Sequence, residues 1–222
     1  MRADCLRPLS FTLAWALALA ALAPAAARAE VTVRTLNQET PAADVVSVGF
    51  HGQVGEIEVV GTSGGTVKLE VTLLCERERD RACREAAAKV DLEARRSGDR
   101  LQLVVEDWPK LRGGGLSFSG RLELPKHLAV EVDMGVGEVS VVGVEADIEV
   151  DTGVGEVSVE AQEALFRSVK MDTGVGEAEL EVGDRTIQGS GFVGGHLSWR
   201  HGPGRGHIEI DSGVGEIRVV LR

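Results

Sequence analysis

The chain of 222 residues contains no tyrosine, and only 4% of its residues are aromatic. Enzymes that cleave polysaccharides need rings on which sugars stack. Beyond residue 29 this chain offers only Trp108, Trp199 and a few Phe. The sequence also lacks a Gly-x-Ser-x-Gly elbow, a His-Glu-x-x-His zinc motif, a phosphate-binding loop and a dinucleotide fingerprint. These absences argue against catalysis, and we expect a protein with neither enzymatic activity nor a cofactor.

Positive charge is also scarce, because 24 Lys and Arg face 35 Asp and Glu, for a net charge of −11. Nucleic acids and anionic membranes are bound through Lys and Arg patches. The composition therefore argues against both partners and favours basic partners or cations.

Long apolar runs are limited to Leu9–Leu22, about 14 residues, where a membrane span needs roughly 20. A basic start precedes this run, and Ala27-Arg28-Ala29 follows it. That layout predicts a secretory signal peptide over residues 1–29, cleaved before Glu30, rather than a retained anchor. We expect an exported protein, in the periplasm or at the cell surface, with no membrane-spanning segment in its mature part.

Cysteine is rare, with three residues in the chain. Cys5 falls in the predicted signal peptide, which leaves Cys75 and Cys83 in the mature part. In an oxidising compartment an even pair favours a disulfide over two free thiols.

What the sequence does contain is a repeated phrase, Asp-x-Gly-Val-Gly-Glu. Full copies begin at Asp133, Asp151, Asp172 and Asp211, and an eroded copy spans His51–Glu56. The first Gly of the full copies are separated by 18, 21 and 39 residues, and 39 is about two periods. The missing copy is then the degenerate stretch 190–195. Such repetition indicates one structural unit copied and stacked. The repeated glycines are Gly135, Gly137, Gly153, Gly155, Gly174, Gly176, Gly213 and Gly215.

The residues between the copies alternate with a period of two, which is typical of strands with one buried face. After the first full copy, Val139 and Val141 share one phase, and Glu138 and Ser140 share the other. A unit of two short strands cannot bury its apolar face alone, so copies must stack. We predict an all-β fold, a β-solenoid of short strands with Gly-rich corners; a β-meander folded into a sandwich is the alternative. The expected core includes Val139, Val141, Val157, Val159 and Leu180.

The first part of the mature chain, residues 30–120, also alternates as strands, for example over Glu56–Val60 and Thr66–Thr72. Between Glu76 and Arg96 the apolar residues fall three or four apart, which predicts one helical insertion. We divide the mature chain into this region and the repeat region 121–222, and expect the two to be continuous as one domain.

Each residue type of the repeated phrase has an expected role. The glycines allow a sharp turn and close packing of corners. We expect the Val between them to point inward or to plug the corner. The Asp residues are interpreted as acceptors for turn N–H groups. The alternative is that Asp133, Asp151, Asp172 and Asp211 bind Ca²⁺ as a carboxylate ladder, together with a parallel ladder of Glu. We expect no metal site.

Two other groups offer candidate binding residues. His196, His201 and His207 lie near Trp199, but they lack the spacing of a metal site, and we expect them to be solvated. We expect Trp108, in a loop rich in Pro and Gly, to cover the edge of the core rather than to bind a ligand.

The stretch Arg121–Lys126, followed by Leu128–Val141, resembles the bacterial adhesin-like "toast-rack" β-repeat domains of unknown function. Gly55–Val59 followed by Gly65–Leu69 is similar to the opening of those domains. His127 departs from them, because Gly often follows the Pro-Lys pair. The resemblance covers nearly all of the mature chain and implies a fold, but it brings no site residues.

Two classes of function follow. We expect a non-enzymatic exported scaffold of the cell envelope that contacts another envelope or surface protein. The alternative is a secreted carbohydrate-active or metal-dependent enzyme on a β-helix scaffold. These sequence patterns do not indicate an oligomeric state.

Overall fold

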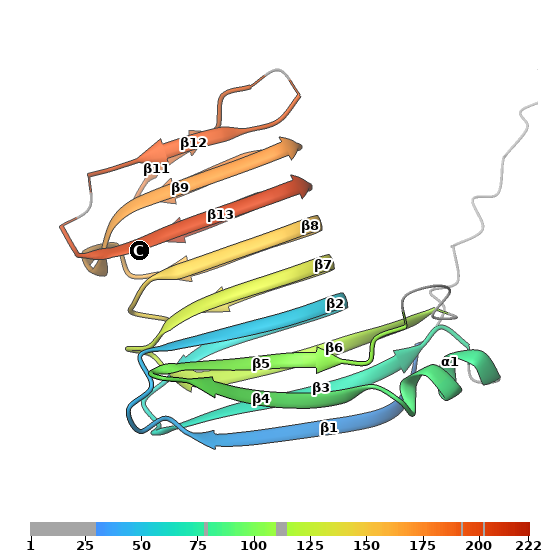
Figure 1. Ribbon diagram of the computed structural model, residues 1–222. Helices are drawn as coiled ribbons and strands as arrows, with labels where there is room; N and C mark the ends of the chain where they lie inside the picture. The colour runs from blue at the N-terminus through green and yellow to red at the C-terminus, as the bar shows by residue number, and fades with distance from the viewer. Residues whose placement is uncertain (1–29, 78–79, 110–114, 192, 202) are drawn as a thin grey trace, which may run out of the picture.

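The computed structural model describes residues 30–222 except 78–79, 110–114, 192 and 202 (Figure 1). The predicted signal peptide and Cys5 lie outside the described residues. Almost all of the described chain is β-structure, as the sequence predicted. Its elements are β1 (Val31–Pro41), β2 (Ser47–Thr62), β3 (Thr66–Cys75), α1 (Arg81–Ala87), β4 (Asp91–Ser97), β5 (Arg100–Glu106), β6 (Leu116–Pro125), β7 (Ala129–Val142), β8 (Ile148–Ala161), η1 (Glu163–Leu165), β9 (Phe166–Val175), β10 (Ala178–Val182), β11 (Arg185–Gln188), β12 (His196–Trp199), β13 (Gly206–Val214) and β14 (Ile217–Leu221).

The strands form one mixed sheet of 14 strands that does not close on itself. Its centre is parallel, in the order β2, β7, β8, β13, β9, and these strands lie one above another in Figure 1. Its flanks include antiparallel pairs: β1 with β3, β3 with β6, β4 with β5, and β12 with β9. The sheet therefore combines stacked repeats with hairpin-like ends.

The long strands β2, β7 and β8 bend at their glycines. Both halves of β7 pair with β2 and β8, whereas β2 and β8 each change one neighbour at the bend. The first half of β8 pairs with β13 and the second half with β14. The first half of β2 pairs with β5 and its second half with β6. In Figure 1 the second halves lie behind the first. The bend thus folds the sheet into two layers that share a core.

The alternation of the sequence explains which side chains fill that core. Val139, Val141, Val157, Val159 and Leu180 are each at most 1% exposed, as predicted. They belong to one hydrophobic cluster that extends from Leu36, in the first strand, to Leu221, in the last. Burying alternate apolar residues of both layers against each other is the main stabilising contribution in such a fold.

A continuous solenoid is not confirmed, because the order of the repeats in space differs from their order in the chain. Strand β13 lies between β8 and β9, so the copy that begins at Asp211 stacks between those that begin at Asp151 and Asp172. The described residues of the degenerate stretch 190–195 do lie at the end of the stack, where Gly195 O accepts from Thr173 N. It leads into β12, which runs antiparallel to β9. The meander alternative does not describe the parallel centre either.

The helix predicted over Glu76–Arg96 is much shorter than expected. It comprises Arg81–Ala87, begins after Asp80, whose side chain accepts from Cys83 N at 3.0 Å, and buries Cys83 and Ala87. Residues 91–97 form β4 instead, antiparallel to β5 through a turn with Gly98 at a φ of 64°. The prediction failed there because Ala94 follows Val90 at a helical spacing of four residues but also follows Leu92 at the period of two of a strand, and the glycine turn favours the hairpin.

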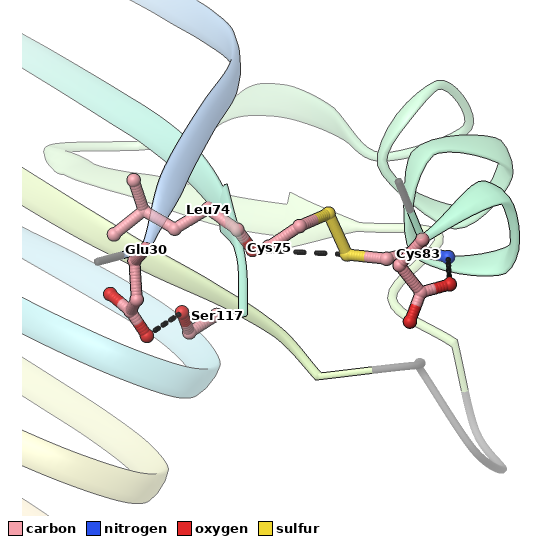
Figure 2. Close-up of a disulfide and its surroundings, with 6 residues drawn as sticks. Glu30, Leu74, Cys75, Cys83 and Ser117 are labelled. Carbon is pink, nitrogen blue, oxygen red and sulfur yellow. Dashed lines mark hydrogen bonds between the residues drawn. A yellow bond between two sulfur atoms is a disulfide. The ribbon is translucent and has the colours of Figure 1, made fainter. Parts of the chain in front are cut away.

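A disulfide joins Cys75, the last residue of β3, to Cys83 in α1 (Figure 2). The two Cα atoms are 6.1 Å apart, and both residues are buried. The predicted pairing is therefore confirmed, and it attaches the short helix to the end of the sheet. Trp108 packs edge-on against Phe118, with ring centroids 5.9 Å apart, at the margin of the core, as expected.

Candidate functional site

The repeated phrase requires glycine because the backbones of neighbouring corners lie too close together to leave room for a side chain. A Cβ atom on Gly155 would lie 1.6 Å from the carbonyl oxygen of Gly137 on the neighbouring strand. The φ of Gly155 is 151°, a conformation that residues with a side chain rarely adopt. The first Gly of each phrase is constrained by space alone: a Cβ on Gly153 would lie 2.6 Å from the carbonyl oxygen of Gly135. The corner geometry thus accounts for both glycines.

The Val between the glycines points outward, so the expectation of an inward Val was wrong. A residue placed between two glycines at a convex bend has its side chain on the solvent side of the turn. The five side chains are between 37% and 47% exposed. The register places them in one column, in the order Val54, Val136, Val154, Val214 and Val175.

On one side of the valine column lies a row of carboxylates that begins and ends with histidine. Strand register gives the order His51, Asp133, Asp151, Asp211, Asp172 and His196. At one end, His51 Nδ1 lies 3.1 Å from Oδ2 of Asp133. At the other end, His196 Nδ1 lies 2.5 Å from Oδ1 of Asp172. We call this set the Asp row. All four candidate metal-binding Asp residues therefore lie together.

The environment of the four carboxylates differs along the row. Asp172 also contacts Lys170 Nζ at 3.2 Å, and the hydrogen bond from His196 is the main reason that its pKa is lowered. Partial burial, followed by the charges of neighbouring carboxylates such as Asp172 and Glu209, raises the pKa of Asp211 against the opposing effect of Lys170. Within the described residues, the side chains of Asp151 and Asp211 form no hydrogen bond or ion pair. The middle of the row therefore carries negative charge that no direct contact neutralises.

A second file of acidic residues lies beside the Asp row on the same face. Strand register aligns Glu131, Glu149 and Glu209. Partial burial, together with the charges of Glu131 and Glu209, raises the pKa of Glu149. An ion pair joins Glu131 to Arg100. Like charges on adjacent strands repel each other, so this face favours cations or cationic partners.

On the other side of the valine column lies the Glu row. It consists of the last residue of each phrase, in the order Glu56, Glu138, Glu156, Glu216 and Glu177. The Asp row, the valine column and the Glu row together form what we call the corner face. With adjacent strands about 4.8 Å apart, the valine column is about 19 Å long.

The corner face departs from the sequence-based expectations in two respects. The two ladders predicted from consecutive copies do form, but the copy that begins at Asp211 is inserted into both. No backbone N–H donates to the four Asp side chains within the described residues, so their role as turn acceptors finds no support. Among the described residues, no three His, Cys, Asp or Glu side chains converge as a metal site would require.

The three histidines near Trp199 do not form a common site. His196 contacts Asp172, His207 Nδ1 lies 2.7 Å from Ser168 Oγ, and the ring of His201 packs against Trp199. All three side chains are exposed, as expected. Sequence analysis also missed His51 as an end of the Asp row, although it occupies the Asp position of the eroded copy.

Neither a protein-family model nor a curated protein matches the chain. A solved structure from Clostridium sporogenes, described as a "putative cell adhesion protein", superposes with a TM-score of 0.52 at 13% identity, covering 85% of this chain and 99% of its own. A "putative adhesin" from Bacteroides fragilis covers 84% of this chain and 97% of its own, at 12% identity and a TM-score of 0.27. A "putative adhesin" from Parabacteroides distasonis covers 57% of both chains, at 10% identity and a TM-score of 0.27.

The predicted resemblance to adhesin-like β-repeat domains is thus confirmed as a likeness of fold, carried by the Clostridium structure. At this identity the likeness does not transfer binding residues or an activity. None of the helices in the described part of the chain combines the length and the apolar character needed to span a membrane.

Proposed function

We propose that the protein is a non-enzymatic exported scaffold of the bacterial cell envelope that binds another envelope or surface protein through the corner face. In this proposal residues 1–29 are removed as a signal peptide, and residues 30–222 function as one domain in the periplasm or at the cell surface. The hydrophobic cluster that extends from Leu36 to Leu221 supports the single domain.

The observation that carries the proposal is the exposed valine column. The corner requires glycine for its close stacking, but nothing in its geometry requires an apolar residue between the glycines. Valine nevertheless stands there in five copies, aligned and partly exposed. Exposed apolar surface rimmed by polar residues is typical of protein interaction sites.

The negative charge of the Asp row and the Glu row indicates which kind of partner the corner face would bind. Carboxylates lie on both sides of the column, so two copies of the corner face would repel each other. A partner with Lys or Arg on either side of an apolar strip matches the face in charge. Such binding should weaken as salt screens the carboxylates.

The proposal can be tested with two matched variants of the mature protein. Val136→Ser/Val154→Ser alters the corner face, and Val46→Ser/Val142→Ser changes two exposed valines outside it. Each immobilised protein is incubated with an envelope extract, and retained proteins are identified by mass spectrometry. We expect one protein to be retained by the wild type and by the control pair, and lost with the corner pair.

Equal retention by all three proteins would contradict the role of the corner face. A panel of glycoside and peptide substrates provides the second arm of the test, because turnover by the purified protein would support the enzymatic alternative instead.

A further inference from the structure

A hollow with positively charged walls lies beside the Asp172 end of the corner face, on the outer side of β13, β9 and β12. Its volume is about 400 Å³. We call it the basic hollow. Its lining includes three cationic side chains, a histidine and two hydroxyls: Arg167, Lys170, Arg200, His207, Ser168 and Ser198. The net charge of −11 gave no sign of such a cluster.

The two arginines of the hollow differ from most arginines of the chain. Arg121 and Arg218 form ion pairs with Glu residues of adjacent strands. Arg167 and Arg200 have no carboxylate partner or side-chain hydrogen bond among the described residues, and both are exposed. Two guanidinium groups thus border one hollow without a counter-charge of their own.

Lys170 has a different role in the hollow. Its Nζ lies 2.7 Å from Oε1 of Glu209 and 3.2 Å from Oδ2 of Asp172. These contacts, with the bond to Glu209 first, raise the pKa of Lys170, which therefore stays protonated. Glu209 is the carboxylate that lines the hollow, and this bond to Lys170 reduces its repulsion of an anion.

The hollow also presents two hydroxyl groups and an imidazole. Ser168 Oγ and His207 Nδ1 are 2.7 Å apart, and Ser198 lies opposite Lys170 on the adjacent strand. Guanidinium forks and hydroxyl groups are the usual protein ligands of tetrahedral oxyanions. We propose that the basic hollow binds a phosphate or sulfate group.

The surroundings restrict which anions can enter. The Asp row begins beside the hollow at Asp172, and Asp211 follows on the next strand. An extended polyanion that continued from the hollow across β9 and β13 would meet this row, whereas a single phosphate or sulfate group can occupy the hollow alone. The group can be carried by a small soluble molecule or by a lipid headgroup, since both present the same oxygens.

The test is a titration of the mature protein with inorganic phosphate, followed by NMR of its backbone amides and Arg Nε–H groups, with chloride at equal ionic strength as the reference. We expect saturable shifts at Arg167, Ser168 and Arg200 with phosphate and not with chloride. Arg167→Gln/Arg200→Gln should weaken binding about tenfold for each guanidinium removed.

Arg185→Gln is the matched control, because Arg185 is an exposed arginine of the edge strand β11 and does not line the hollow. It should leave the phosphate affinity unchanged. The melting temperatures of all variants confirm that they are folded. An absence of saturable shifts, an equal response to chloride, or an equal loss of affinity in Arg185→Gln would overturn the proposal.

Two further probes distinguish the sources of the group. Glycerol 3-phosphate represents the soluble form, and vesicles of phosphatidylcholine and phosphatidylglycerol in equal amounts represent the membrane form. Binding of glycerol 3-phosphate without vesicle binding supports a soluble ligand, and Arg167- and Arg200-dependent vesicle binding supports a lipid headgroup. Binding of inorganic phosphate alone supports a free ion as the ligand, and binding of none of the three probes would overturn the proposal. No residue of the valine column lines the hollow, so the valine variants should bind phosphate normally whether or not the proposed function holds.

Discussion

His196 and Asp172 face each other on antiparallel strands, with His196 Nδ1 2.5 Å from Asp172 Oδ1. The contact lies at the end of the Asp row, where β12 reverses the direction of the sheet. One strand further in, Asp211 has no such partner. The same residue type in the same repeated phrase therefore occupies opposite electrostatic situations.

This difference predicts opposite effects of two identical substitutions. Asp211→Asn should raise the free energy of unfolding by about 0.2–1 kcal/mol, because it removes like-charge repulsion between adjacent strands. Asp172→Asn should lower it by about 0.2–1 kcal/mol, because it weakens the contacts with His196 and Lys170 at a partly exposed site. Urea unfolding at neutral pH measures both. Changes of the same sign would contradict the assigned environments.

The gain from Asp211→Asn should also depend on pH. Because the pKa of Asp211 is raised in the folded protein, the folded form takes up a proton before the unfolded form as the pH falls. The repulsion is thus fully present above the raised pKa and is relieved as the pH falls towards the ordinary Asp value near 4. The stability difference between variant and wild type should shrink over that range. A constant difference would contradict this.

Corner stacking predicts which glycines can be replaced. Gly155→Ala should destabilise the protein by about 3 kcal/mol or more, because the added methyl group meets the carbonyl of Gly137 and the backbone must leave its φ of 151°. Gly65→Ala is the control, because a Cβ there has no neighbour within 4 Å. It should change stability by less than about 0.5 kcal/mol. Similar melting temperatures for the two variants would refute the stacking argument.

Two valines three residues apart test the boundary between core and corner face. Val157 is 1% exposed and Val154 is 45% exposed. Val157→Asp places a charge in the core and should cost several kcal/mol or prevent folding. Val154→Asp should cost less than about 1 kcal/mol, mainly from added repulsion beside the Asp row. A soluble Val157→Asp protein with wild-type circular dichroism and melting would show that the assigned strand phase is wrong.

The disulfide predicts a measurable loss when it is removed. Exported protein should contain no free thiol under denaturing conditions, and Cys75→Ala/Cys83→Ala should lose roughly 2–3 kcal/mol, because the short closed loop restricts the unfolded chain. Thiol titration and thermal melting measure the two quantities. Two reactive thiols in the native exported material would contradict the pairing.

Calcium should have little effect on the Asp row. Ca²⁺ takes six to eight oxygen ligands at about 2.3–2.6 Å, whereas carboxylates on successive strands follow a spacing of about 4.8 Å. We therefore expect millimolar CaCl₂ to leave the melting temperature almost unchanged. A rise that grows with the logarithm of the calcium concentration, and that Asp151→Asn abolishes, would instead establish a cation site.

Local patterns could be read from this sequence because each depends on neighbouring residues. Val139 and Val141 alternate with Glu138 and Ser140, and burial follows that alternation. The helix prediction was wrong over residues 91–96 because Ala94 fits a helical spacing from Val90 and a strand alternation with Leu92, and only pairing with β5 decides between them. The outward Val could not be predicted, because its direction depends on which side of the bend the core lies.

The order of the copies was beyond prediction for a different reason. The phrases beginning at Asp172 and Asp211 share all but one residue, Thr173 in one and Ser212 in the other, so their local preferences are nearly the same. The choice between them is made by distant contacts. The basic hollow was missed for the same reason, because Arg167 and Arg200 are far apart in the chain and meet only when β12 pairs with β9.

The insertion of β13 and β14 between earlier strands has a consequence for how the chain folds. In the sheet, β9 pairs only with β13 and β12, and β10 only with β14 and β11. During synthesis, residues 166–182 emerge while the edge of β8 is still open, and they carry a phrase that fits it. We expect a transient arrangement in which β9 and β10 occupy the place of β13 and β14. The native protein then forms only when β13 and β14 displace β9 and β10 from the edge of β8. Copies of one repeated phrase therefore compete for the same edge during folding.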